Sequence, residues 1–151
     1  MTAFALILAA VSGSAPTVDE AILLYENGDI PGAIEALSDL VDAPGLSLDD
    51  RLRAWDRLGS AYFAMGEMAS ARNAYLQILM LDVHYDLSPR ANPRLRELLG
   101  QVREENMATA VVQSSPEGAF VTLSGEFLGV TPMVLDGLLA GESYEVSAFA
   151  N

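Results

Sequence analysis

The sequence predicts an α+β fold, with N-terminal α-helical hairpin repeats followed by a small all-β module. Three observations predict it. Apolar residues recur at helical spacing through residues 17–106. From residue 109 onward they fall into short runs divided by glycine and proline, as strands do. The 151 residues suffice for one domain or two small ones. We place the parts at residues 17–106 and 109–151, with the change near Asn106 and Met107.

The first fifteen residues are set apart from both parts. Residues 4–11 are apolar and residues 12–15 are small, the order of a signal peptide and its cleavage zone. The run is too short to span a membrane, which takes about 20 residues. No basic residue precedes it, unlike in most signal peptides. We expect residues 1–15 to be a signal peptide and the protein to be periplasmic or secreted; a misplaced start or a first array helix is the alternative.

The charge of the chain narrows its range of partners. The net charge is −13, from 21 acidic residues against eight arginines, and there is no lysine. Nucleic-acid binding requires a basic surface, so we expect no nucleic-acid partner. The same charge disfavours anionic lipid surfaces, and we expect no membrane insertion once the signal is removed. The chain has no cysteine, which excludes disulfides and thiolate metal sites.

Capping signals divide the helical part into five predicted helices. Thr17 and Glu20 have the spacing of a capping box, and the helix they open ends at Asn27 and Gly28. A second helix begins near Ile30 and ends before residue 44. Ser47, three residues before Asp50, opens a third that ends at residue 66. A fourth spans residues 67–81, and an amphipathic fifth spans residues 92–105 as a lid over the end of the array.

The third and fourth helices carry a repeat signature. Small residues stand where two antiparallel helices would approach closely, and large ones where they would fill the wedge between hairpins; the set is Trp55, Leu58, Gly59, Tyr62, Gly66, Ala71, Tyr75 and Leu81. This set resembles a tetratricopeptide repeat, and a weaker copy reads Ala21, Leu24, Gly28, Ala33 and Leu37. The chain departs from the family at Val83, where proline is usual.

Resemblance to tetratricopeptide repeats implies a peptide-binding surface on the first helix of each hairpin. The residues it places there are Ile22, Tyr25, Glu26, Arg53, Asp56, Ser60 and Phe63. Tyr25 and Phe63 would be apolar anchors, and Arg53 would clamp a carboxylate. In an array this short, the same residues could instead contact the lid helix or solvent.

The C-terminal part contains a second family signature. Residues Pro116, Glu117, Gly118 and Ala119 spell the turn after which PEGA domains are named, and the segment resembles such a β-sandwich module. We expect Pro116 and Gly118 to build a tight turn, with Val121 and Leu123 alternating inward. The expected strands are residues 109–114, 119–123, 126–128, 133–135 and 143–149. Its aromatic residues are Phe120, Phe127, Tyr144 and Phe149, and most of them should lie in the core. The last strand should present an edge for strand pairing with a partner.

No set of residues predicts catalysis or a bound metal. Asp82, His84 and Asp86 could ligate a metal, but alternating polar residues are also ordinary in a loop between helices. The acidic residues near position 45 lack the spacing of a calcium-binding loop. A single histidine and no cysteine leave no recognisable nucleophile and base. We therefore expect no cofactor, no metal and no enzyme activity.

These observations predict a non-enzymatic interaction or scaffold protein of the bacterial cell envelope. Its helical array would bind a protein or peptide partner. The alternative is a glycan- or peptidoglycan-binding envelope protein that acts through the β module.

Overall fold

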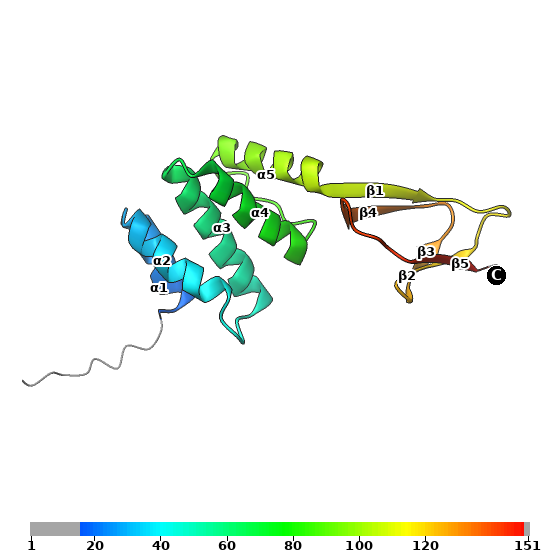
Figure 1. Ribbon diagram of the computed structural model, residues 1–151, viewed down its shortest axis with the longest axis horizontal. Helices are drawn as coiled ribbons and strands as arrows, with labels where there is room; N and C mark the ends of the chain where they lie inside the picture. Colours follow the sequence, from blue (N-terminus) through cyan, green and yellow to red (C-terminus); the bar gives the residue numbers. More distant parts are fainter. Residues whose placement is uncertain (1–15, 150–151) are drawn as a thin grey trace, which may run out of the picture.

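A computed structural model describes residues 16–149, so the predicted signal peptide lies outside the described residues. Within that range five helices precede five strands, and Figure 1 shows them at opposite ends of an elongated molecule. The helices are α1 (Val18–Glu26), α2 (Ile30–Val41), α3 (Leu48–Ala64), α4 (Met68–Leu81) and α5 (Pro93–Asn106). The strands are β1 (Met107–Val112), β2 (Phe120–Leu123), β3 (Glu126–Val130), β4 (Met133–Leu139) and β5 (Val146–Phe149). The predicted α+β class is confirmed.

Local sequence signals set the helix ends where they were predicted. Thr17 and Glu20 form the complete capping box of α1, which satisfies amide groups that have no partner within the helix. The Ser47 hydroxyl accepts from the amide of Asp50 at 3.1 Å and opens α3. Gly28 and Gly66 follow the C-caps with φ angles of 85° and 79°, a left-handed conformation in which a side chain would be strained.

Two apolar cores hold the helices together, and two aromatic residues connect them. The first core lies between α1, α2 and α3 and includes Leu37 and Leu58. The second lies between α4, α5 and the segment that joins them, and includes Tyr75 and Leu99. Trp55 and Tyr62 of α3 pack against both cores. These aromatic residues therefore tie one helix pair to the next.

Close helix contact explains one glycine of the repeat signature. A Cβ atom at Gly59 of α3 would lie 3.2 Å from the ring of Tyr75 in α4. Tyr75 itself is fully buried. A larger residue at position 59 would have to displace this ring, so the predicted need for a small side chain is confirmed there.

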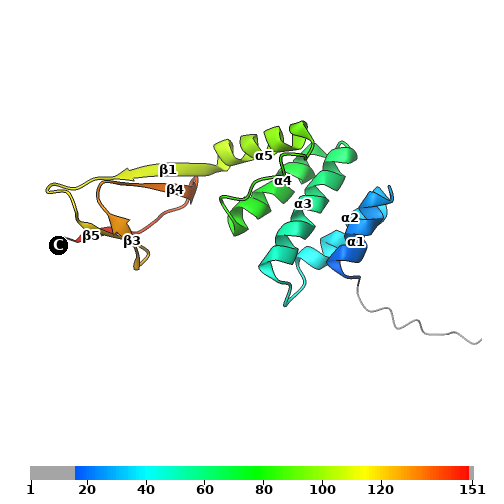
Figure 2. The ribbon, with the colours of Figure 1, turned by 180° about the vertical axis from the view of Figure 1, so that it is seen from behind.

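The β module consists of two small antiparallel sheets. β1 pairs with β4, and β2 lies between β3 and β5. The first strand begins at Met107, directly after the last residue of α5 and two residues before its predicted start. Figure 2 shows from behind how β1 continues outward from the end of α5. The amide of Ala140, just after β4, donates to the carbonyl of Asn106 at 2.8 Å and ties the strand pair to this helix end.

The module has a very small interior. The apolar side chains that it buries are Ala119, Val121 and Leu135. The prediction that its aromatic residues form the core is wrong: Phe120, Phe127, Tyr144 and Phe149 are all exposed. The inward position predicted for Val121 is confirmed, since Val121 is fully buried, whereas Leu123 is half-buried; alternation along the strand turns Phe120, next to Val121, outward.

Candidate peptide-binding surface

The predicted groove residues come from α1 and α3, which pack side by side around the first core. Ile22 and Tyr25 are half-buried at its margin, and Glu26 is exposed at the end of α1. The guanidinium carbon of Arg57 lies 5.1 Å from the centre of the Tyr25 ring, a cation–π contact between the helices. Arg57 was not predicted. It lies four residues after Arg53 on α3, and this spacing is the signal that could have identified it.

Arg53 is already engaged within the chain. Its guanidinium forms ion pairs with Asp19 of α1 and Asp50 of α3, and its hydrogen bond to Asp19 contributes most to raising the pKa of Arg53. These groups are largely exposed, so the pairs contribute little to stability. An incoming carboxylate would have to displace Asp19 from a surface pair. Arg53 can therefore act as a clamp by exchanging one carboxylate for another.

Asp56 faces the connection between α4 and α5 instead of solvent. Its pKa is raised because burial disfavours the charged carboxylate, while the charge of Arg57 and a hydrogen bond from Tyr85 act in the opposite direction. Burial likewise raises the pKa of Tyr85. Tyr85 lies in the segment of residues 82–92 and carried no sequence signal, because only the folded chain brings it to α3.

Ser60 and Phe63 also point into the protein. Ser60 is only 6% exposed, and its hydroxyl lies 3.5 Å from that of Tyr75. Phe63 packs against the second core, which includes Leu87 from the same connecting segment. The structure thus divides the predicted groove. Ile22, Tyr25, Glu26 and Arg53 form one surface, which includes Arg57, whereas Asp56, Ser60 and Phe63 contribute to internal packing.

A second concave feature lies on another side of α3. A cavity of about 430 Å³ is floored by Trp55, Leu58 and Tyr62 and walled by residues of α2 and α4. A smaller cavity of about 260 Å³ shares Trp55, Val41 and Asp42 with it. The half-buried aromatic residues that connect the two cores therefore also border a groove.

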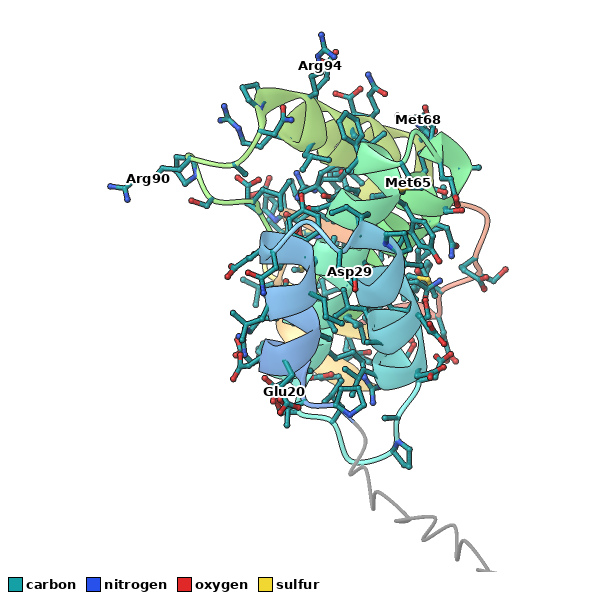
Figure 3. All side chains as sticks on the ribbon, turned by 90° about the vertical axis from the view of Figure 1, so that its left-hand side faces the viewer. Glu20, Asp29, Met65, Met68, Arg90 and Arg94 are labelled. Carbon is teal, nitrogen blue, oxygen red and sulfur yellow. The ribbon has the colours of Figure 1, made fainter. Side chains whose placement is uncertain are left out.

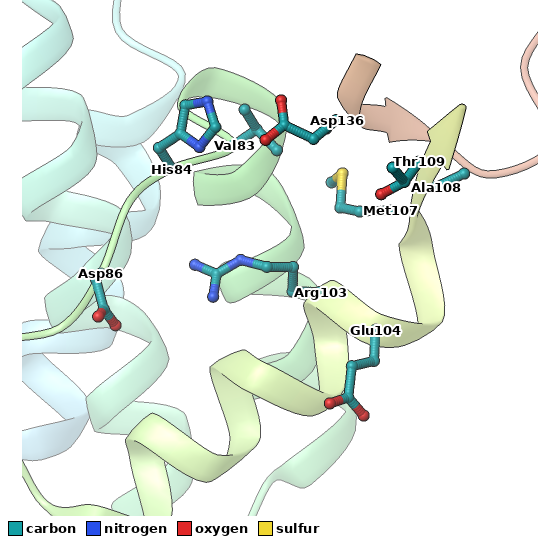
Figure 4. Close-up of a pocket in the computed structure, with 10 residues that line it drawn as sticks. Val83, His84, Asp86, Arg103, Glu104, Met107, Ala108, Thr109 and Asp136 are labelled. Atoms are coloured by element: carbon teal, nitrogen blue, oxygen red, sulfur yellow. The ribbon is translucent and has the colours of Figure 1, made fainter. Parts of the chain in front are cut away.

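A third cavity, of about 370 Å³, lies where the helices meet the β module. Figure 4 shows Arg103 extending from α5 into it, with His84 and Asp86 on one side and Asp136 of β4 near His84. The guanidinium of Arg103 donates to the backbone carbonyl of Tyr85. This bond fixes the connecting segment against α5.

The residues considered for metal binding have structural partners. The Asp82 carboxylate accepts from the amide of His84 at 3.0 Å, and that of Asp86 accepts from the amide of Leu87 at 2.9 Å. Within residues 16–149 no three His, Asp or Glu side chains converge in a way that could hold a metal ion. The two carboxylates order the backbone of the loop.

Charged and apolar groups are also exposed at the helical end of the molecule. Figure 3 shows Arg90 and Arg94 extending outward near the start of α5, and Met65 and Met68 at the turn between α3 and α4. Arg90 and Arg94 have no ion pair within residues 16–149, in contrast to Arg53 and to Arg72, which pairs with Glu105. Among the described residues, arginines without an ion pair therefore lie at the start of α5.

The PEGA turn is held by one threonine. The amide of Gly118 donates to the carbonyl of Thr131 at 2.9 Å, and the amide of Thr131 donates to the carbonyl of Ala119 at 2.9 Å. Gly118 has a φ of 91°. The Thr131 hydroxyl accepts from the amide of Ala119 at 3.0 Å. Pro116 and Glu117 remain exposed at the tip. The predicted turn at Pro116 and Gly118 is confirmed, and Thr131 accounts for its geometry.

Residues 107–147 match the family model described as the PEGA domain. The C-terminal module is a PEGA domain. Such domains are typical of extracellular or periplasmic proteins. The match does not extend to the helices, so their resemblance to tetratricopeptide repeats stays a prediction. No curated protein and no solved structure shows significant similarity to the chain. Among residues 16–149, no helix has the length and apolar character needed to cross a membrane.

Proposed function

We propose that the protein is an exported, non-enzymatic interaction protein of the cell envelope. The helical array would bind a protein segment, and the PEGA domain would space or tether it outside the cytoplasm. The PEGA match supports the compartment. The binding role is supported by the surface on α1 and α3, where Tyr25 stacks with Arg57 beside the Arg53 ion pairs.

The chemistry of this surface suits a peptide that carries a carboxylate next to an apolar group. Arg53 and Arg57 lie one helical turn apart on α3 and supply two guanidinium groups. Tyr25 and Ile22 supply a half-buried apolar surface beside them. Asp50 pairs with the other guanidinium nitrogen of Arg53, so Arg53 stays oriented when a ligand displaces Asp19, which reduces the entropy lost on binding.

A comparison of affinity captures from an envelope extract tests this role. The bait is the whole protein, with Arg53→Gln and Tyr25→Ala variants and with Glu35→Gln as the control, since Glu35 is exposed on α2. Proteins whose recovery falls for both groove variants and not for the control would support the proposal. Identical recovery by all four baits would contradict it.

A second candidate is binding of glycan or peptidoglycan through the PEGA domain. It is favoured by the exposure of all four aromatic residues of the module, because exposed rings can stack on sugars. Sedimentation with purified cell-wall sacculi tests it, with the Phe127→Ser variant as the comparison. Loss of co-sedimentation in that variant would support this function, and no co-sedimentation of the native protein would exclude it.

A further inference from the structure

Three phenylalanines and a valine form an apolar face on the outer side of the three-stranded sheet. Phe120 of the central strand lies directly opposite Val130 of β3 and Phe149 of β5, so these three side chains form a row across the sheet. Phe127 is next to the row, and its ring packs edge to face on that of Phe120 at 5.8 Å between centres. We call these four residues the phenyl face.

The side chains of the phenyl face are available to a partner. Phe127 and Phe149 are each 57% exposed, Val130 47% and Phe120 39%. The strand register adds the hydroxyl residues Thr122 and Ser147 to this side of the sheet and no charged residue. Burying the phenyl groups would have stabilised a module whose interior is otherwise small, so their outward position costs stability that binding could offset.

The charge around the face determines what kind of partner fits. From residue 107 to the end the sequence has no Arg, Lys or His, and its acidic residues are Glu117, Glu126, Asp136, Glu142 and Glu145. Glu117 lies in the PEGA turn near the row of Phe120. The carbonyl of Glu145 accepts from the amide of Ser124, so Glu145 lies at the other end of β2; Glu126, which pairs with Leu123 at that end, belongs to the opposite side of the sheet. An apolar face bordered by carboxylates at both ends suits an apolar segment flanked by basic residues.

The area of the face favours a short segment over a second copy of the module. At ~150–250 Å² for a complete aromatic side chain, the exposed parts amount to roughly 300–500 Å². A stable protein–protein interface takes about 800 Å² from each partner. Two such modules would also bring together ten carboxylates, five from each, with no basic group. A sugar would find few hydrogen-bond partners on this side of the sheet, because the strand register places only two side-chain hydroxyls there, those of Thr122 and Ser147.

We propose that the phenyl face of the PEGA domain docks a short apolar protein segment flanked by lysine or arginine. This site is separate from the helical surface described above, and the two can be tested independently. Apolar burial would supply most of the affinity, and the surrounding carboxylates would select for the basic flanks.

A peptide titration followed by fluorescence anisotropy tests the site with the whole protein. The probe is a fluorescein-labelled heptapeptide with a central Leu-Phe-Leu between pairs of lysines. Two matched peptides carry glutamates in place of the lysines, or three serines in the centre. We expect the first peptide to bind at least tenfold more tightly than either matched peptide, and its affinity to fall as salt is raised.

Exposed phenylalanines can be changed without disturbing the interior, so variants locate the site. Phe127→Ser and Phe149→Ser should each weaken binding at least fivefold. Val134→Ser is the matched control, because Val134 is 60% exposed on the other sheet, and it should leave binding unchanged. Circular dichroism shows which variants remain folded, and each phenylalanine variant tests the face separately. Arg53→Gln should not affect this peptide.

Three results would overturn the proposal. One is a failure of specificity, seen as equal binding of the lysine and glutamate peptides or as an equal loss of binding in the Val134→Ser control. Another is a dimer, detected by light scattering, that dissociates in Phe127→Ser, since the face would then serve a second copy. The third is co-sedimentation with sacculi that depends on Phe127 while none of the peptides binds, which would assign the face to a glycan.

Discussion

Gly137 of β4 lies against Val83 of the segment between α4 and α5, and the contact leaves no room for a side chain at position 137. A Cβ atom there would be 2.5 Å from Cγ2 of Val83, and the φ of Gly137 is 71°. Both residues line the cavity at the junction of helices and strands. Val83 stands where the tetratricopeptide repeats that the helices resemble usually have proline, and its side chain contacts the PEGA domain.

The first prediction concerns this contact. Gly137→Ala should destabilise the protein by about 1–3 kcal/mol, from the steric overlap with Val83 and the strain of a positive φ. Val83→Ala in the background removes the two closest overlaps, with Cγ2 and Cγ1, and leaves the Cβ contact at 3.0 Å, so the cost should fall toward the about 1 kcal/mol expected from the strain. Urea unfolding of the four proteins in this cycle measures both values. Equal costs in the two backgrounds would show that Val83 does not restrict position 137.

The second prediction concerns Trp55, which packs against both helical cores. Trp55→Ala should lower the free energy of unfolding by about 2–4 kcal/mol, somewhat less than for a fully buried tryptophan because one side borders the groove. Trp55→Phe should lose less than half as much free energy of unfolding as Trp55→Ala. Thermal unfolding followed by circular dichroism at 222 nm provides the measurement, and an unchanged midpoint in Trp55→Ala would exclude the connecting role.

How far the sequence could predict this fold depends on the range of the interactions involved. The capping box of Thr17 and Glu20 and the turns at Gly28 and Gly66 follow from residues close in sequence, and they were predicted correctly. Repeat spacing also identified Gly59 as a site of close helix approach, although it did not identify Tyr75 as the residue that approaches it. The contacts of Asp56 with Tyr85 and of Gly137 with Val83 join distant segments, and no local pattern encodes them.

The PEGA domain shows a different kind of error. Alternation along β2 correctly placed Val121 inside, and the same alternation requires Phe120 to point outward. The expectation that most of the aromatic residues form the core considered only their hydrophobicity and did not take this alternation into account. In a sheet of four- and five-residue strands, the position of a residue in the alternation decides burial, and hydrophobicity alone does not.

The third prediction is a loss of stability in alkali that depends on Tyr75. Burial raises the pKa of this phenol from 10.0 to about 12. The folded state therefore retains a proton that the unfolded state has lost, and stability should be complete below pH 10 and fall as the pH rises toward 12. A shift of this size corresponds to about 2–3 kcal/mol.

Urea midpoints between pH 8 and 11.5 test this prediction in the native protein and in Tyr75→Phe. The variant lacks the Tyr75 titration, so its midpoint should fall less steeply with pH. Tyr85 is present in both proteins, and because burial and Asp56 raise its pKa more than Tyr75 does, most of its contribution cancels in the difference. Parallel curves would contradict a shifted pKa at Tyr75.

The fourth prediction concerns Thr131 and the turn for which the domain is named. Thr131 is buried, and its hydroxyl is the acceptor for the amide of Ala119. In Thr131→Ala that amide loses its partner, at a cost of about 1–3 kcal/mol, whereas Thr131→Ser keeps the hydroxyl and should cost less. The expected effect is local, because the PEGA turn is remote from both helical cores.

Hydrogen exchange followed by NMR can separate such local loosening from global unfolding. The Ala119 amide should exchange about 5- to 150-fold faster in Thr131→Ala, while amides of α3 and α4 keep their native rates. Similar acceleration in the helices would show that the two parts unfold as one unit. Unchanged exchange at Ala119 in Thr131→Ala would show instead that the backbone bonds to residue 131 are sufficient to hold the turn.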